Sequence, residues 1–297
     1  MHAPFHLDAN KMTRIFRCGT HVFELARPLV MGVLNVTPDS FSDGGRFVDR
    51  QSALAHARKM REDGADLIDV GGESSRPGAL PVEESLELER VIPVIETLAR
   101  DGIAVAVDTR KPAVMRTAIA AGASMVNDIA ALTAPGALEV CAAGATGVCL
   151  MHMRGEPSTM QRAPVYDNVV AEVRDFLVAR AAACEAAGIA PERIAIDPGF
   201  GFGKTRAHNL TLLRAIADFA ATGYPVLVGL SRKKSLGEIT GRATDERLAA
   251  SLAAALAAVA RGASIVRVHD VRETVDALKV WRAIERQGDD RAQPDDE

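Results

Sequence analysis

Several short apolar runs in this chain end in an acidic or amide side chain. Such side chains could hold a flat, nitrogen-rich ring. Asp108, Asn127 and Asp197 each end one of these runs, and Lys233 follows another. A carboxylate can accept two N–H hydrogen bonds from an amino-amidine edge, and an asparagine can donate and accept in the same plane. A pterin has this edge, a 2-amino group beside a ring N–H, and its 4-oxo group could accept from the lysine. These four residues therefore predict a pocket for a pterin-like heterocycle.

A second group of residues is cationic and could hold a highly charged leaving group. It comprises Arg76, Arg267 and His269, and the arginine fork suits phosphate oxygens. Arg267 and His269 are two residues apart, so on a strand both side chains point to the same face. Asn35, with loop oxygens, could help hold a hydrated Mg²⁺, which prefers oxygen ligands and substrate phosphates. The sequence suggests no Ser-His-Asp set and no cysteine in the cluster, so it does not indicate an activated nucleophile.

Each of these residues also has an ordinary structural explanation when it is taken alone. An aspartate at a strand end is often a helix cap or a turn residue. The glycines of GFGFG, from Gly199 to Gly203, often mark a plain turn, and a lone histidine such as His269 is more often structural than catalytic. Their repeated placement at the ends of apolar runs is what favours a shared site.

An alternation of short β-branched runs with helical patterns predicts how these residues are positioned. The expected strands are Leu29–Leu34, Leu67–Val70, Ala104–Asp108, Met125–Asn127, Gly147–Met151, Ile194–Asp197, Val226–Gly229 and Ser264–Val268. The expected helices are Arg50–Asp63, Val82–Arg100, Pro112–Ala121, Tyr166–Ala187, Thr205–Ala221, Asp245–Arg261 and Val271–Ile284. Several helices end at a glycine placed for a left-handed C-cap, at Gly64, Gly122, Gly188 and Gly262.

Eight such units predict an α/β fold, a (β/α)8 TIM barrel whose C-terminal strand ends form the active face. An open, doubly wound sheet is the structural alternative. The segments Thr13–Arg17 and His21–Leu25 around Cys18-Gly19-Thr20 predict a short N-terminal β-hairpin below the barrel floor. We expect one domain over residues 12–285, with flexible termini at 1–11 and 286–297.

Composition narrows the class of protein. The 297 residues are 48% hydrophobic with a net charge of −4, which gives no electrostatic footprint for nucleic acid or an anionic membrane. The N-terminal residues resemble neither a signal nor a transit peptide, and the apolar stretch Leu248–Ala260 is too short to span a bilayer. The four cysteines lack metal-ligand spacing and indicate reduced thiols in a cytoplasmic protein.

Eight motifs, in order along the chain, resemble the dihydropteroate synthase family. They are MGVLNVTPDSFSDGG (Met31–Gly45), GADLIDVGGESSRPGA (Gly64–Ala79), DTRKP (Asp108–Pro112), VNDI (Val126–Ile129), MHM (Met151–Met153), DPGFGFGK (Asp197–Lys204), SRK (Ser231–Lys233) and RVHDV (Arg267–Val271). The first two are long enough to be specific, and the resemblance extends from about Leu29 to Ile284.

The resemblance implies a transferase of folate biosynthesis. Such an enzyme condenses 6-hydroxymethyl-7,8-dihydropterin pyrophosphate with p-aminobenzoate to give 7,8-dihydropteroate and pyrophosphate. The family mechanism is thought to begin with loss of pyrophosphate in an SN1-like step, after which the aniline nitrogen attacks the pterin methylene. Family members are generally homodimers, and here the alanine-rich segment Leu248–Ala260 and the last helix offer faces for a second subunit.

The resemblance also assigns roles to matching positions. It implies pterin binding by Asp108, Asn127, Met151, Asp197, Phe202 and Lys233, and pyrophosphate binding by Asn35, Ser75, Arg76, Arg267 and His269, with Mg²⁺ at Asn35. It implies p-aminobenzoate binding by Ser75, Arg76, Pro77, Lys233 and Lys234, and a catalytic set of Asn35, Arg76, Asp108, Lys233, Arg267 and His269. The loops Val36–Gly45 and Glu73–Leu80 are expected to close over the site.

Two departures from the family pattern bear on the p-aminobenzoate side. Ser75 stands where the family often has threonine, which keeps the hydroxyl, and Lys234 stands where it usually has serine, with Ser235 next. Lys234 either contacts the p-aminobenzoate carboxylate or lies in solvent.

Two rival functions are a methyltransferase barrel that binds methyltetrahydrofolate and a non-catalytic pterin-binding paralogue. The first would not need the NVTPDSFSDGG and SRPGA loops. The second should have lost Asn35, Arg76, Lys233 or Arg267, and all four are present. A generic phosphate-sugar barrel would share the fold alone.

Overall fold

The parallel sheet at the centre of the molecule is a barrel of eight strands. The computed structural model describes residues 14–37, 45–74 and 78–285. Within them the strands are β3 (Leu29–Asn35), β4 (Leu67–Gly71), β5 (Val105–Asp108), β6 (Met125–Asp128), β7 (Gly147–Met151), β8 (Ile194–Asp197), β9 (Leu227–Val228) and β10 (Ile265–Val268). Their order is β8-β7-β6-β5-β4-β3-β10-β9. A bridge between Ile196 and Val226 joins the two edges, so the barrel prediction is confirmed.

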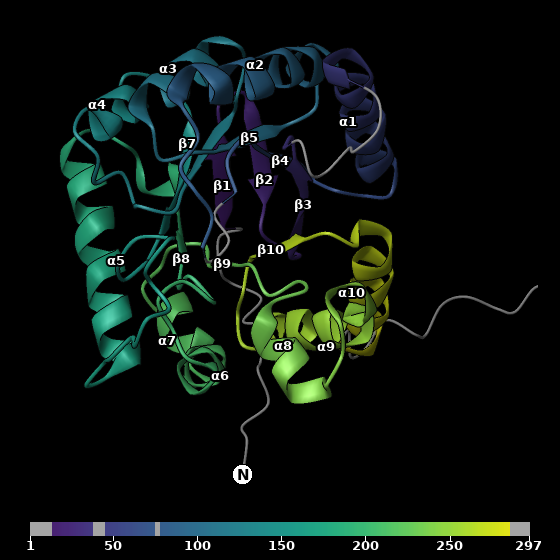
Figure 1. The fold of residues 1–297 in the computed structure, drawn as a ribbon. Helices are drawn as coiled ribbons and strands as arrows, with labels where there is room; N and C mark the ends of the chain where they lie inside the picture. Colours follow the sequence, from purple (N-terminus) through teal and green to yellow (C-terminus); the bar gives the residue numbers. More distant parts are fainter. Residues whose placement is uncertain (1–13, 38–44, 75–77, 286–297) are drawn as a thin grey trace, which may run out of the picture.

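Helices surround the strands and cover the outside of the sheet (Figure 1). They are α1 (Gly45–Glu62), α2 (Glu84–Arg100), α3 (Pro112–Ala120), α4 (Ala137–Ala142), α5 (Val169–Ala186), α6 (Arg206–Arg214), α7 (Ile216–Ala220), α8 (Lys234–Thr240), α9 (Leu248–Val259) and α10 (Val271–Glu285). The predicted C-cap glycines Gly64, Gly122, Gly188 and Gly262 all have positive φ, between 93° and 105°. The prediction of left-handed helix ends is therefore confirmed.

Two of the differences between the predicted and the observed helices have a clear local cause. The segment Thr205–Ala221 divides into α6 and α7, because the Ala215 N–H bonds back to the carbonyls of Thr211 and Leu212 in a tight final turn. The α5 helix begins at Val169 because the Asn168 side chain caps it by accepting from the Ala171 N–H. The short helix α4 was not predicted, since six residues give too little periodicity.

Strand residues alternate between the inside and the outside of the barrel, and this alternation places the polar residues. One inward layer is apolar and contains Leu67, Ala106, Met125, Cys149, Ala195 and Ile265. Successive strand residues face opposite sides, so the residue two positions later again points inward. In the same order those later residues are Asp69, Asp108, Asn127, Met151, Asp197 and Arg267. This second layer, polar except for Met151, therefore lies next to the apolar one, toward the C-terminal ends of the strands.

An antiparallel hairpin closes the opposite end of the barrel. Strands β1 (Ile15–Cys18) and β2 (His21–Glu24) pair around Gly19-Thr20, and Phe16 and Cys18 are buried against the apolar inner layer. The Gly19 N–H donates to the Ala145 carbonyl at 2.9 Å. This confirms the predicted hairpin at the barrel floor. None of the helices in the described parts of the chain is long and apolar enough to cross a membrane.

Candidate active site

A pocket opens where the barrel strands end, and it gathers most of the residues singled out from the sequence. Its lining consists of Asp108, Asn127, Ile129, Met151, Asp197, Phe200, Phe202, Gly229, Lys233 and Arg267. Seven of these were predicted as site residues, and they come from six different strands or the loops that follow them. The structure thus brings together side chains that are spread over 160 residues of sequence.

Arg267 crosses the pocket from β10 and binds two carboxylates. Its Nε donates to Oδ2 of Asp69 at 2.5 Å, and its Nη2 donates to Oδ2 of Asp108 at 2.8 Å. Arg267 therefore shares the pocket with the predicted pterin-binding residues. The expectation of a separate cationic group is wrong for this residue, because two carboxylates on β4 and β5 hold its guanidinium inside the barrel.

Asp69 supports the pocket from behind its lining and is not among the residues predicted from the sequence. It lies within the expected strand Leu67–Val70, and its carboxylate is fully buried and holds both Arg267 and Asn127. The missed signal was a charged residue inside the buried run Leu67–Gly71, two positions after the inward-facing Leu67. A carboxylate at such a position must find partners inside the barrel.

The carboxylates of Asp108 and Asp197 are held less acidic than usual by their surroundings. Burial raises the pKa of Asp108 to about 7, with a further increase from the nearby negative charge of Asp69 that Arg267 partly offsets. Burial raises the pKa of Asp197 to about 6, against the opposing effect of a hydrogen bond from the Gly199 N–H, 2.7 Å from Oδ1. Both groups can therefore change protonation near neutral pH.

The loop after β8 forms one wall of the pocket, and its own residue Lys204 fixes its position. The buried Lys204 ammonium lies 2.9 Å from Nδ1 of His152 and donates to the carbonyls of His152 and Phe202. Burial lowers the pKa of Lys204 to about 7 and that of His152 to about 3. Gly199 has φ of +71°, and any side chain there would collide with the His152 carbonyl oxygen. This packing sets the position of the Phe202 ring.

Lys233 lies over the face of Phe202, with its Nζ 4.3 Å from the ring centroid. It precedes α8 directly, on a turn in which Arg232 adopts a positive φ of 59° and pairs with Asp270. A cation above an aromatic ring is favourable when it is shielded from water. The arrangement places one positive charge beside the acceptors Asp108 and Asp197.

The other predicted residues lie around this pocket or outside the described chain. Asn35 ends β3 and pairs in register with Gly71, which itself pairs with Asp108. His269 follows β10, and its Nδ1 lies 3.0 Å from Oγ of Ser231. Ser75, Arg76 and Pro77, and residues 38–44 of the first expected closing loop, lie outside the residues that the structure describes.

Lys234 is not part of the described pocket lining. Its side chain is 88% exposed and pairs with Glu238 one helical turn later, at 3.6 Å. This geometry favours the solvent alternative over a contact with the p-aminobenzoate carboxylate.

A network of ion pairs fixes both ends of the second expected closing loop. The Lys111 ammonium donates to Glu73 at 2.7 Å, to the buried Glu87 at 2.5 Å and to the Val82 carbonyl at 2.6 Å. Glu73 also accepts from the Val82 N–H at 2.9 Å. The residues on either side of the loop are thus tied together through one lysine that follows β5.

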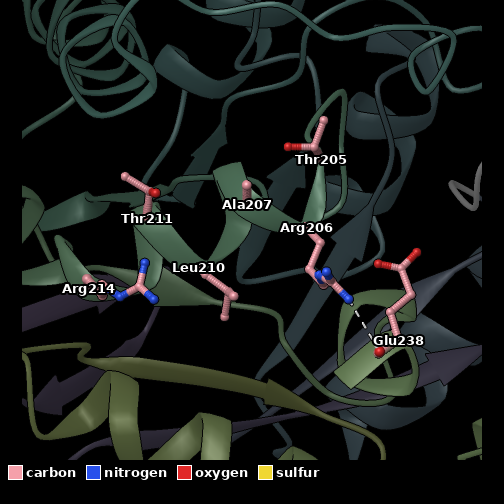
Figure 2. Close-up of a pocket in the computed structure, with 7 residues that line it drawn as sticks. All are labelled: Thr205, Arg206, Ala207, Leu210, Thr211, Arg214 and Glu238. Carbon is pink, nitrogen blue, oxygen red and sulfur yellow. Dashed lines mark hydrogen bonds between the residues drawn. The ribbon is translucent and has the colours of Figure 1, made fainter. Parts of the chain in front are cut away.

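A wider groove on the outside of the barrel is not this site. It lies between α6 and α8 and is lined by Thr205, Arg206, Ala207, Leu210, Thr211, Arg214 and Glu238 (Figure 2). Arg206 donates across it to the Glu238 carbonyl at 3.4 Å. It contains none of the predicted site residues and opens to solvent, so we place the candidate site at the barrel mouth.

The described residues provide few protein ligands for a metal. No group of three or more His, Cys, Asp or Glu side chains suited to a metal occurs in the described ranges. The side-chain amide of Asn35 offers one oxygen ligand, and Asn35 lies level with Asp108 in the sheet, with Gly71 of β4 between them. A single oxygen ligand fits Mg²⁺, which keeps several waters and binds chiefly through substrate phosphates.

Comparisons with known proteins agree with this geometry. A family model described as "Pterin binding enzyme" matches residues 31–269. The chain is 52% identical over 276 residues to a dihydropteroate synthase of Neisseria meningitidis serogroup C, covering 91% of this chain and 97% of that one. It is 51% identical over 271 residues to that of Escherichia coli K12, covering 91% and 96%.

Solved structures give the same result. The Xanthomonas albilineans dihydropteroate synthase with 4-aminobenzoic acid superposes with a TM-score of 0.87 at 52% identity, covering 92% of this chain and 99% of that one. The Burkholderia cenocepacia enzyme complexed with 7,8-dihydropteroate gives a TM-score of 0.84 at 51% identity, covering 92% and 97%. The chain belongs to the dihydropteroate synthase family of pterin-binding enzymes.

Proposed function

We propose that this protein condenses 6-hydroxymethyl-7,8-dihydropterin pyrophosphate with p-aminobenzoate and releases pyrophosphate, with the pterin bound at the barrel mouth. The observation that carries the assignment of the site is the convergence of Asp108, Asn127 and Asp197 with Lys233 in one pocket. These groups supply several acceptors and one cationic donor. That set complements a ring with a 2-amino group, a ring N–H and a 4-oxo group.

The pocket stabilises charge and has little to offer as a nucleophile. Its described lining contains no hydroxyl, thiol or imidazole group, and its two carboxylates already accept hydrogen bonds from Arg267 and from the Gly199 N–H. Both points argue against a covalent intermediate on the protein. We therefore propose that C–O cleavage comes first. The Arg267 cation favours the departing pyrophosphate, and the buried carboxylates of Asp108 and Asp197 favour positive charge developing on the pterin methylene. His269, beside Ser231, is proposed as a further pyrophosphate contact.

The second step needs no strong base. The aromatic amine of p-aminobenzoate is neutral at pH 7 and can attack the pterin methylene directly, losing its proton afterwards. We propose that Ser75, Arg76 and Pro77 form the p-aminobenzoate side of the site with Lys233. Met151 and Phe202 line the pocket and exclude water from the pterin ring.

A magnesium ion is part of this proposal. Asn35 would hold it together with oxygens of the substrate pyrophosphate, and the ion would neutralise charge on the leaving group. Omission of Mg²⁺ and addition of a chelator should then reduce binding of the pyrophosphate ester while leaving binding of a pterin without phosphate unchanged.

We also propose a homodimer in the cytoplasm. Neighbouring helices α9 and α10 expose large apolar side chains, among them Leu248, Val280 and Ile284. Sedimentation analysis of the protein, with Val280→Glu and Ile284→Glu as variants, tests whether these residues lie between subunits. The four cysteines are free and buried, which suits a reducing compartment.

The proposed function is tested by measuring pyrophosphate release from the pterin ester with and without p-aminobenzoate. We expect steady turnover that depends on both substrates and forms 7,8-dihydropteroate. Methyl transfer from methyltetrahydrofolate, or pterin binding without turnover, would support the rival functions instead.

A further inference from the structure

Asp69 is a charged residue placed where the fold would accept an apolar one. It lies in the middle of β4, its exposed fraction is zero, and it pairs in register with Val33 on one side and Ala106 on the other. One of its oxygens, Oδ1, is buried without a hydrogen-bond partner among the residues that the structure describes. A buried carboxylate with an unsatisfied oxygen is costly for stability. Packing alone therefore does not explain this residue.

The Asp69 carboxylate acts through a single oxygen on two residues of the pocket. Oδ2 accepts from Nε of Arg267 at 2.5 Å and from Nδ2 of Asn127 at 3.1 Å. Asp69 does not itself belong to the pocket lining, whereas both of its partners do. Its influence on a ligand must therefore pass through Arg267 and Asn127.

The contact between Asp69 and Asn127 decides which way the amide faces. An asparagine side chain can place either its NH₂ group or its carbonyl oxygen toward a neighbour, and the neighbour determines which. Oδ2 of Asp69 already accepts from Arg267, so it faces Asn127 as an acceptor and requires the NH₂ group. The side-chain oxygen of Asn127, Oδ1, accepts no hydrogen bond from any described residue. It is left for the pocket as an acceptor.

A hydrogen-bond acceptor at the position of the Asn127 oxygen favours binding of a pterin that carries a 2-amino group. A carboxylate that binds the ring N–H and one hydrogen of the 2-amino group leaves the second amino hydrogen without a partner. A fixed Asn127 oxygen satisfies that hydrogen. The same oxygen would repel a ring that carries a 2-oxo group, because two acceptors would then face each other.

We propose that Asp69 is a positioning residue that sets the specificity of the pocket for a 2-amino over a 2-oxo ring. It does so by holding the Asn127 amide in one orientation. Its bond to Nε of Arg267 also turns the guanidinium so that Nη2 meets Asp108. The inference rests on the proposed pterin site, and it adds a residue that touches no substrate.

The test compares two ligands in one variant. Calorimetry would measure the affinities of 6-hydroxymethylpterin and its 2,4-dioxo counterpart for the unaltered protein and for Asp69→Asn. With an amide at position 69, Asn127 is free to turn and donate to the 2-oxo group. The preference for the 2-amino ligand should then fall by about tenfold, the value of one hydrogen bond of about 1.4 kcal/mol. A merely structural role would weaken both ligands equally and leave their ratio unchanged.

Two further variants show whether Asn127 carries the effect. In an Asn127→Ala background, Asp69→Asn should cause no additional change in the ratio. Asp128→Asn is the matched control: Asp128 is equally buried and adjacent to Asn127, but its hydrogen bonds go to the backbone N–H groups of Ala130 and Leu132. It should leave the ratio unchanged. An unaltered ratio in Asp69→Asn, or an equal change in Asp128→Asn, would overturn the inference.

A measurement on the unaltered protein covers the case in which Asp69→Asn does not fold. In NMR spectra of the ligand-free protein, the Asn127 side-chain NH₂ protons should exchange slowly with water. Fast exchange, as for an exposed asparagine, would overturn the inference. Failure of the proposed pterin site has a different result, since neither ligand would then bind the unaltered protein.

Discussion

Nη2 of Arg267 donates to Oδ2 of Asp108 across 2.8 Å, inside a pocket that contains both residues. The first was predicted to bind pyrophosphate and the second to bind the pterin ring. Their direct contact means that the two parts of the substrate are bound by one connected set of side chains. A change at either residue should therefore affect both parts.

Arg267→Ala should weaken binding of a pterin without phosphate as well as binding of pyrophosphate. The substitution leaves Asp69 and Asp108 without their shared cation, and loss of a charge-assisted hydrogen bond costs about 1.5–3 kcal/mol. We expect at least a tenfold loss of pterin affinity by calorimetry. Arg206→Ala, in the outer groove, is the control and should change neither affinity. Unchanged pterin affinity in Arg267→Ala would show instead that the residues that bind pyrophosphate are separate from those that bind the pterin.

Asp197→Asn should weaken pterin binding by about ten- to a hundredfold. The amide must place one donor where the carboxylate offered only acceptors, so at least one ligand N–H faces a mismatched group. The comparison is Asp175→Asn on the outer face of α5, where the side chain is 68% exposed. If both variants bind a pterin equally well, Asp197 does not contact the ring.

Pterin affinity should depend on pH between about 5 and 8. The pKa values of Asp108 and Asp197 are raised to about 7 and about 6, and only the ionised carboxylates accept N–H bonds without offering a proton in return. Affinity should therefore be highest above pH 7 and should fall by about tenfold per pH unit as the first group gains its proton. The measurement is calorimetry across this range, corrected for titration of the ligand.

A flat profile would mean that both carboxylates stay ionised throughout the range. In Asp108→Asn the upper step should disappear and the lower one, from Asp197, should remain.

Much of the barrel could be predicted because the alternation of residues along each strand shows which of them face inward. Asp108, Asn127 and Asp197 end apolar runs of four residues or so, and a period of two places all three on the inner side. The pairings between these strands join residues that are far apart in sequence. The two-residue period and the length of the apolar runs therefore predicted which residues line the pocket, but not the contacts between them.

The parts that were missed depend on tertiary contacts. Asp69 sits inside a strand of otherwise apolar and small residues, and its partners Arg267 on β10 and Asn127 on β6 are distant in sequence. Similarly, no local pattern shows that Lys204 is buried against His152 or that Lys111 joins Glu73 to Glu87. These interactions form only when the barrel closes.

Lys234 should have little influence on p-aminobenzoate. Its side chain is exposed and paired with Glu238, and such exposed pairs contribute at most about 1 kcal/mol, or a factor of about five. Lys234→Ser and Lys234→Glu should each leave the KM for p-aminobenzoate within that factor and kcat unchanged. A much larger increase for the glutamate, reduced by added salt, would show instead that Lys234 meets the carboxylate.

Pyrophosphate release by the purified protein is the measurement that tests the central claim most directly. With the pterin pyrophosphate ester, Mg²⁺ and p-aminobenzoate present, we predict sustained release of pyrophosphate with equimolar formation of 7,8-dihydropteroate. Asp108→Asn and Arg267→Ala should each reduce the rate by at least about tenfold. Release that does not depend on p-aminobenzoate, or full activity in both variants, would contradict the assignment of this pocket to the condensation.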